Sequence, residues 1–204
     1  MPKQKSTEDL KQEKIRLIHR TAVKVFSKKG FYKSRISDII TEAKIAYGLY
    51  YHYFKSKDDI LIYIFETAWL ELLKQVNMIV EKNPDPVKQL ESILDYCFGI
   101  YTANPDLLKV LIMDVPRLNK FYEKKYQKIY ISFFQKIADI IRFGQDMGHF
   151  SKKISAEIAA NMLIASIDVT IRQKVYNPEL MDDKTDFKMI SANIMNILKF
   201  GILK

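Results

Sequence analysis

The chain has 204 residues, of which 48% are hydrophobic and 28% charged, so it is long and apolar enough to bury a substantial core. Its 12% aromatic content excludes an intrinsically disordered protein, and the lack of an uncharged apolar run of about 18 residues excludes a membrane-spanning one. The formal net charge of +9 favours an acidic partner such as nucleic acid, a membrane surface or an anionic ligand.

The N-terminus and the cysteine usage predict the compartment. The start, MPKQKSTEDLKQEK, is charged and has no apolar stretch behind it, so we expect no secretory signal. A lone Cys97 cannot close an intramolecular disulfide, which fits the reducing cytoplasm.

The positive charge is concentrated in the first third of the chain. Residues 1–60 contain 14 Lys and Arg against 7 Asp and Glu, a net charge of +7, whereas residues 61–204 contain 19 against 17, a net charge of +2. This asymmetry predicts two functional regions, of which the first meets an acidic partner. The alternative is a basic soluble surface without a partner.

Hydrophobic periodicity predicts an all-α fold of about nine helices. Glycine and proline are scarce, at six each, and no proline lies between Pro2 and Pro84, which permits long helices. In chain order, we expect a helix ending at Gly30, then 36–43, 46–54, 56–83, 86–102, a short one from 105, a long one from Pro116 to Gly144 or Gly148, 155–176 and 184–203.

Residues 36–54 have the sequence form of a helix-turn-helix, because two short apolar stripes follow a longer helix inside the basic third. In such a motif the second helix enters the major groove while its neighbours hold the phosphates. We therefore predict a three-helix DNA-binding domain at residues 1–57, with the motif at 36–55, and a C-terminal helical bundle domain at residues 58–204.

Residues 43–61, AKIAYGLYYHYFKSKDDIL, resemble the signature of the TetR family of transcriptional regulators, in which Tyr-x-x-Phe-x-x-Lys ends the recognition helix. The resemblance extends over residues 10–65, and there are two departures from it. Lys44 stands at the usual turn glycine, and Ala46 replaces the usual capping Ser or Thr. The small, apolar and glycine positions that match upstream are Ala22, Phe26, Gly30, Ile36, Ile39 and Ala43.

The candidate DNA contacts lie at the beginning of the second helix and along the third. Gly48 lets the backbone approach a base or phosphate, and Ala46 can contact a thymine methyl group. Tyrosine hydroxyls and a lysine at a helix N-terminus can donate to phosphates. The predicted set is Ser34, Arg35, Ser37, Ala46, Tyr47, Gly48, Tyr51, His52, Tyr53 and Lys57.

Some residues in and beside this set are expected to have a structural role, or have one as an alternative. Tyr50 and Phe54 are expected to pack inward, because aromatic clusters at helical spacing usually form core. His52 either faces solvent or lies beside a phosphate. The Ser34 hydroxyl is expected to cap the second helix by accepting a hydrogen bond from a free backbone N–H.

The resemblance implies that residues 66–204 bind a small molecule and form a homodimer through the last two helices. The helix before the last is apolar on more than one face, so it needs a second apolar neighbour, which a symmetry mate can supply. A monomeric bundle is the alternative. The candidate interface residues are Met162, Ile171, Phe187, Ile190, Ile194, Ile197 and Leu198.

Aromatic and methionine residues of the middle helices either form core or line an apolar pocket. Asp168 and Arg172 lie four residues apart on an otherwise apolar helix, so they pair with each other, cross the dimer interface or orient a polar group of a ligand. The candidate pocket residues are Trp69, Tyr101, Met113, Arg117, Phe121, Tyr126, Phe133, Met162, Asp168 and Arg172.

The sequence also resembles, more loosely, the acyl-CoA-sensing branch of the family, through residues 55–61 and 167–170. This resemblance implies that an acyl tail lies among the apolar helices and that Arg117, Lys120 or Lys124 meets the phosphates.

We therefore expect a ligand-responsive transcriptional repressor that binds a palindromic operator as a homodimer and is released by a hydrophobic small molecule. An enzyme is not expected, because His19, His52 and His149 lie far apart without partners at metal-ligand spacing, and there is no phosphate loop or nucleophile elbow. No metal or cofactor is expected either. A helical adaptor or membrane-surface protein is the alternative, but it leaves the Tyr-x-x-Phe-x-x-Lys segment unexplained.

Overall fold

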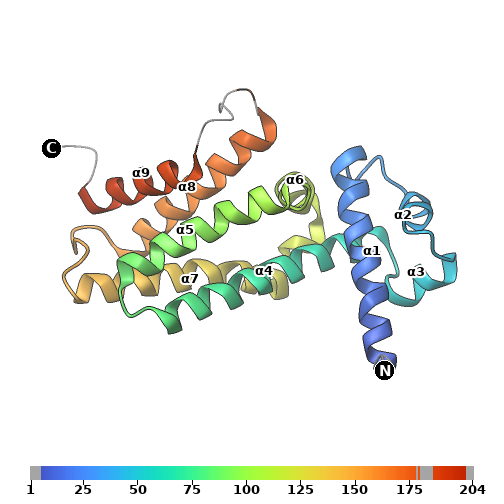
Figure 1. The fold of residues 1–204 in the computed structure, drawn as a ribbon, viewed down its shortest axis with the longest axis horizontal. Coiled ribbons are helices and arrows are strands. Elements are labelled where there is room, and N and C mark those ends of the chain that lie inside the picture. Colours follow the sequence, from blue (N-terminus) through green and yellow to red (C-terminus); the bar gives the residue numbers. More distant parts are fainter. Residues whose placement is uncertain (1–5, 178, 180–185, 201–204) are drawn as a thin grey trace, which may run out of the picture. The chain divides into compact units, whose positions relative to one another are not determined.

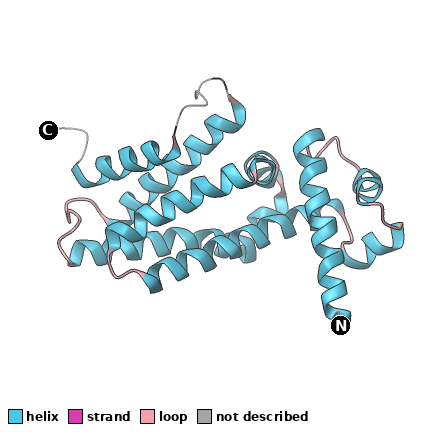
Figure 2. Cartoon of the chain, viewed as in Figure 1, coloured by secondary structure: helices cyan, strands magenta, loops and turns pink. Residues whose placement is uncertain are grey.

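The computed structural model describes residues 6–177, 179 and 186–200 (Figure 1). Within these residues the regular elements are nine α-helices and two short 3₁₀-helices, with no strand (Figure 2). The all-α fold is therefore confirmed. The ends of the predicted final helix, residues 184–185 and 201–203, lie outside the described residues.

The N-terminal helices begin and end at residues whose chemistry explains the boundary. The Ser6 hydroxyl accepts the Asp9 N–H at 3.1 Å and the Asp9 carboxylate accepts the Ser6 N–H, a reciprocal cap. Gly30 ends the first helix at φ 76°, and the Ser56 hydroxyl accepts the Asp59 N–H at the start of the fourth helix. These helices are α1 (Thr7–Lys29), α2 (Ile36–Ala43), α3 (Tyr47–Tyr53) and α4 (Lys57–Lys82).

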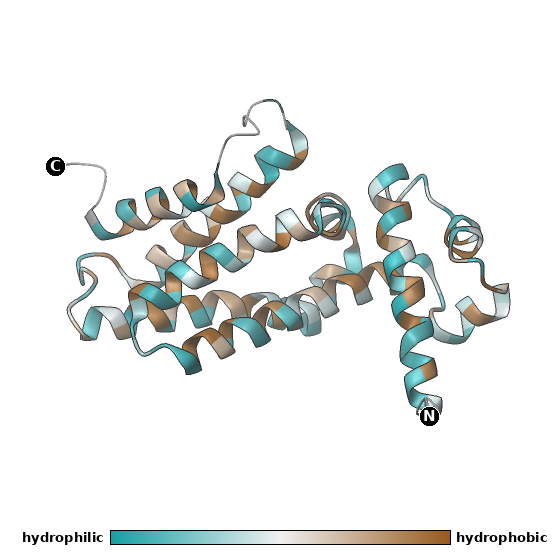
Figure 3. Cartoon of the chain, in the orientation of Figure 1, coloured by the Kyte–Doolittle hydropathy of each residue, from teal (hydrophilic) through white to brown (hydrophobic). Residues whose placement is uncertain are grey.

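The remaining helices follow the predicted boundaries closely, except after residue 113. The side chains of Asp85 and Ser155 cap α5 and α8 by accepting backbone N–H groups. These helices are α5 (Pro86–Ala103), α6 (Pro105–Met113), α7 (Lys124–Asp146), α8 (Ala156–Tyr176) and α9 (Phe187–Phe200). Figure 3 shows hydrophobic and hydrophilic residues alternating along them, as amphipathic helices require.

The prediction of a long helix that begins at Pro116 is wrong. Two 3₁₀-helices, η1 (Val115–Arg117) and η2 (Asn119–Tyr122), occupy this stretch, and α7 begins only at Lys124. Val115 and Leu118 are both buried, three residues apart. Side chains at that spacing lie on one side of a 3₁₀-helix, so the observed turns allow both to be buried.

Packing divides the chain into two units whose boundary differs from the predicted one at residue 57. The first unit comprises Met1–Ala68 and Asp106–Glu123, and the second comprises Trp69–Pro105 and Lys124–Lys204. Helix α4 therefore runs through both units, and a segment from the middle of the chain joins the N-terminal helices.

Each unit has a hydrophobic core of its own, as an independently packed body requires. In the first unit the residues at most 1% exposed include Ile18, Ala22, Phe26, Ile39, Tyr50, Ile60 and Ile64. In the second they include Leu90, Ile93, Leu94, Phe98, Ile137, Ala160 and Leu163.

Candidate DNA-binding surface and ligand region

The turn between α2 and α3 shows both departures expected at residues 44 and 46. Lys44 has φ 53° and ψ 47°, a left-handed conformation, and its N–H donates to Ile40 and Thr41 carbonyls. A non-glycine residue costs about 1 kcal/mol in this region. Ala46 occupies the N-cap of α3 without a side-chain hydrogen bond, so a free N–H group remains at the start of this helix.

Helix α3 has an outward face and an inward face. Tyr47 and Tyr51 are 57% and 49% exposed, and a Cβ added at Gly48 would meet no atom within 4 Å. Tyr50 is fully buried and donates its hydroxyl proton to the Ser56 carbonyl at 3.1 Å, and Phe54 is buried too, as predicted. Of the other residues predicted to contact DNA here, Ala46 and His52 are exposed and Tyr53 is half-buried.

Ser34 and Lys57 differ from the others, because their polar atoms bind the chain itself. Ser34 is 2% exposed, and its hydroxyl donates to the Gly30 carbonyl at 2.6 Å. The Lys57 ammonium donates to the carbonyls of Phe31 at 2.6 Å and Ser34 at 2.9 Å. These bonds correct the expectation that both residues present their polar groups to phosphates.

The cap of α2 also differs from the prediction. Arg35, not Ser34, is the N-cap residue, and the Asp38 carboxylate accepts the Arg35 N–H at 2.8 Å. The Arg35 side chain is exposed and Ser37 is partly exposed. Both side chains can therefore be reached by a partner at the N-terminal end of α2.

Lysines of α1 neutralise the two acids of α2. Lys29 lies 2.8 Å from Asp38, and Lys24 pairs with Glu42. The hydrogen bonds from these lysines lower the pKa of both carboxyls, so both are ionised at neutral pH. This pairing limits repulsion between the acids of α2 and a phosphate backbone.

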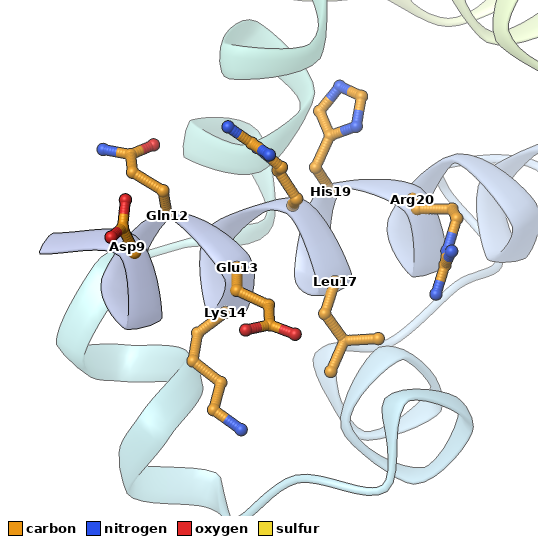
Figure 4. Close-up of a pocket in the computed structure, with 8 residues that line it drawn as sticks. Asp9, Gln12, Glu13, Lys14, Leu17, His19 and Arg20 are labelled. Carbon is orange, nitrogen blue, oxygen red and sulfur yellow. The ribbon is translucent and has the colours of Figure 1, made fainter. Parts of the chain in front are cut away.

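A hollow beside α1 does not resemble the expected ligand pocket. Its lining comes from this one helix, and the labelled side chains point in several directions from it (Figure 4). His19 on this helix packs edge-on against Tyr63, and burial lowers its pKa. The lining is polar apart from Leu17 and consists of Asp9, Gln12, Glu13, Lys14, Arg16, Leu17, His19 and Arg20.

The ten residues predicted to line one pocket are divided between the units. Met113, Arg117 and Phe121 belong to the first unit and the other seven to the second. Met162 is 50% exposed on the outside of α8, which corrects its assignment to a pocket. Tyr101 packs against Phe187, with ring centroids 5.7 Å apart.

In the second unit, an aromatic cluster lies next to an ion pair. Trp69 packs edge-on against Tyr130 and Phe133, with centroid distances of 4.9 and 5.6 Å. Phe133 is buried, as is the predicted pocket residue Tyr126. Such a cluster supplies the apolar surface that a hydrophobic ligand requires.

The two unusual charges of α8 pair with each other. Arg172 Nε donates to Asp168 Oδ2 at 2.7 Å. Burial raises the pKa of Tyr130, as does the nearby Asp168 charge, while Arg172 opposes the shift. Tyr130 therefore belongs to this group, and its distance from α8 in the sequence concealed the relationship.

Helix α8 exposes a second apolar stripe, opposite its buried one. Ile158, Met162 and Val169 are 56%, 50% and 53% exposed at spacings of four and seven residues, and Tyr176 continues the stripe. On α9, Ile197 is 45% exposed.

The structure corrects part of the predicted interface set. Ile171 is buried in the chain's own core, and Phe187 stacks on Phe98 with ring centroids 4.9 Å apart. The half-buried members of the set are Ile190, Ile194 and Leu198.

The described residues contain no group of three His, Cys, Asp or Glu side chains that could hold a metal ion. Of the helices in the described ranges, none has the length and hydropathy needed to cross a bilayer.

A helix-turn-helix with an exposed recognition helix, in the part of the chain with most of the positive charge, defines a DNA-binding regulator. The family "Bacterial regulatory proteins, tetR family" matches residues 18–64, and "YsiA-like protein, C-terminal region" matches residues 65–201. The chain belongs to the TetR family of transcriptional regulators, which are not enzymes.

Relatives and solved structures agree with this family. The "Fatty acid metabolism regulator protein" of Bacillus subtilis is 24% identical over 192 residues, covering 94% of this chain and 97% of the relative. The uncharacterized HTH-type regulator YvdT of the same organism is 29% identical over 170 residues, covering 83% and 84%.

Two solved structures share the fold. FadR from Bacillus subtilis in complex with stearoyl-CoA has a TM-score of 0.81 at 24% identity, covering 92% of this chain and 99% of that one. FadR from Bacillus halodurans has a TM-score of 0.82 at 20% identity, covering 98% of both chains.

Proposed function

We propose that this protein is a repressor of fatty-acid metabolism genes, which binds a palindromic operator as a homodimer and leaves it when a long-chain acyl-CoA binds. The observation that carries the regulatory part is the exposed face of α3 in the basic first third of the chain. The metabolic part rests on the full-length similarity to the B. subtilis regulator and on the stearoyl-CoA complex of its structural neighbour. Its place of action is the cytoplasm, where bacterial DNA lies.

DNA recognition divides between bases and phosphates. Ala46, Tyr47 and Gly48, at the exposed N-terminal end of α3, contact base edges in the major groove. Phosphates are held by hydroxyl and guanidinium donors, together with His52. These donors are Arg35, Ser37, Tyr51 and Tyr53.

The exposed stripe of α8, together with Ile197 of α9, forms the interface between two copies. A symmetric interface requires a surface that is complementary to itself, and an apolar stripe along one helix meets this requirement. Ile158, Met162 and Val169 would each lose their exposed apolar area on pairing. The dimer then places two recognition helices about 34 to 36 Å apart, one turn of DNA.

The effector binds in the second unit. The cluster around Trp69 supplies apolar contacts for an acyl chain, and Arg172 with Tyr130 supplies hydrogen-bond donors at its polar side. Because Arg172 already pairs with Asp168, the ion pair orients the guanidinium before a ligand arrives.

Selection from random double-stranded DNA tests the regulatory proposal. We expect a palindromic sequence to be enriched, and its affinity to fall steeply as salt rises because bound phosphates release counterions. Stearoyl-CoA should weaken binding to the selected sequence, whereas free CoA, which lacks the acyl chain, should not. Failure to enrich any sequence would refute the DNA-binding proposal, and an equal response to both compounds would refute the acyl-CoA proposal.

A further inference from the structure

Residues 106–123 belong to the first unit although both of their neighbours in the chain, α5 and α7, belong to the second. Val110, Val115 and Leu118 of this segment are buried. Phe121 packs edge-on against Phe65 of α4, with ring centroids 5.2 Å apart. A segment from the middle of the chain therefore contributes to the core of the DNA-binding unit.

The same segment contacts the loop between α1 and α2. Asp114 Oδ1 accepts the Phe31 N–H at 3.5 Å, and the Tyr32 hydroxyl donates to the Arg117 carbonyl at 3.2 Å. Asp114 is only 6% exposed. A carboxylate buried so deeply is costly unless hydrogen bonds and opposite charges surround it.

Positive groups do surround Asp114. Burial raises its pKa, while the Phe31 N–H and the charges of Arg117, Lys109 and Lys57 act in the opposite direction. The Lys57 ammonium donates to two carbonyls of the same loop and lies 4.3 Å from the centroid of the Phe31 ring. Asp114 therefore binds a backbone N–H group of the loop, and Lys57 binds two of its carbonyl groups.

The beginning of α4 is fastened to the segment as well. Lys120 Nζ lies 2.7 Å from Asp59 Oδ1, and the Ser56 hydroxyl accepts the Asp59 N–H. The segment therefore contacts both the loop that precedes α2 and the helix that follows α3.

We propose that residues 106–123 act as a clamp, which sets the position of α2 and α3 by holding the chain on both sides of the helix-turn-helix. Asp114 and Lys57 are positioning residues of this clamp, and Lys57 acts on the loop instead of neutralising a phosphate. Only the DNA-binding test of Lys57 rests on the proposed function.

Hydrogen exchange in the full-length, DNA-free protein tests the clamp directly. Asp114→Asn removes the charge and keeps the shape, Tyr32→Phe removes only the hydroxyl, and Asp106→Asn is a matched control at an exposed acid of the same segment. We expect amides of residues 30–38 to exchange on the order of tenfold faster in Asp114→Asn, and less so in Tyr32→Phe, with other peptides unchanged.

Unchanged exchange of residues 30–38 in both variants would overturn the proposal. If Asp114→Asn fails to fold, the exchange rates of Tyr32→Phe decide whether the clamp exists. Tyr32 is 62% exposed, so this substitution leaves the packing intact. This measurement needs neither operator nor effector, so it can refute the clamp without refuting the proposed function.

The role of Lys57 is decided by the salt dependence of DNA binding. A residue that neutralises one phosphate contributes about 0.9 to the slope of log K against log salt. We expect Lys57→Gln to lower affinity for the selected DNA with the slope unchanged. A slope reduced by about 0.9 would show that Lys57 leaves the loop and binds a phosphate, and would overturn its assignment as a positioning residue.

Discussion

The Lys57 ammonium donates a hydrogen bond to the Phe31 carbonyl oxygen at 2.6 Å, across 26 positions of sequence. This bond ties the first residue of α4 to the loop before α2. The most conspicuous cation of the recognition motif therefore stabilises the motif from inside, and burial lowers its pKa accordingly. The surface that we propose for DNA contact is the outer face of α3 and the outer end of α2.

Lys44→Gly should stabilise the protein. The left-handed conformation of Lys44 costs about 1 kcal/mol or more, and glycine removes this cost. The greater conformational entropy that glycine gives the unfolded chain offsets only part of the gain. We expect a gain of roughly 0.5 kcal/mol in the free energy of unfolding, measured by urea denaturation. Lys14→Gly, at an exposed position inside helix α1, is the control and should cost about 1 kcal/mol. A loss of stability in Lys44→Gly would contradict the assigned turn conformation.

The Lys120–Asp59 pair should make stability depend on pH. Lys120 lowers the pKa of the Asp59 carboxyl in the folded protein below its usual value of 3.8. The pair therefore contributes stability at higher pH, and this contribution is lost as pH falls through the lowered value. Lys120→Gln should cost about 0.5–1 kcal/mol at neutral pH and almost nothing near pH 2. Lys124→Gln, at an exposed position, is the control; an equal cost of Lys120→Gln at both pH values would argue against the ion pair.

Ser191→Ala should stabilise the second unit. Ser191 Oγ is buried and has no hydrogen-bond partner among the described residues. Removing an unsatisfied hydroxyl recovers about 1 kcal/mol of desolvation cost. Ser132→Ala is a suitable control, because its hydroxyl donates to the Lys128 carbonyl near the surface and its removal should change little. The thermal midpoints of the two variants compare them, and destabilisation by Ser191→Ala would show that the hydroxyl has a partner.

Val169→Glu should convert the proposed homodimer into monomers. Val169 is 53% exposed in the middle of the α8 stripe, so a carboxylate there would face its symmetry mate in an apolar interface. Gln135→Glu, at an exposed position of α7, adds the same charge away from that stripe. Analytical ultracentrifugation should report a monomer for the first variant and a dimer for the second. A Val169→Glu dimer would place the interface elsewhere.

Local sequence rules were sufficient where local interactions decide the structure. The helix starts next to Ser56 and Ser155, the left-handed Lys44 and the inward Tyr50 all follow from side chains within a few positions. The all-α fold and the position of the helix-turn-helix follow from periodicity in the same way.

Apart from the one-residue error at the cap of α2, the main errors lie where residues distant in the sequence decide the structure. The 3₁₀ turns at 115–122 and the inward Lys57 depend on contacts between residues 26 to 85 positions apart. No pattern within α6 or α4 indicates these contacts. On α8, both faces were recognised as apolar, but Ile171 lies two residues beyond the outward Val169, a rotation of about 200° that places it inside.

The affinity of the full-length protein for its selected DNA, measured across a salt titration, is the decisive test of DNA reading by α3. We expect tight binding to a palindrome, with log K falling linearly as log salt rises, and a clear loss of affinity in Tyr51→Phe because the substitution removes a phosphate donor. Binding that favours no sequence, or that does not respond to salt, would contradict the assignment of the outer face of α3 as a DNA-reading surface.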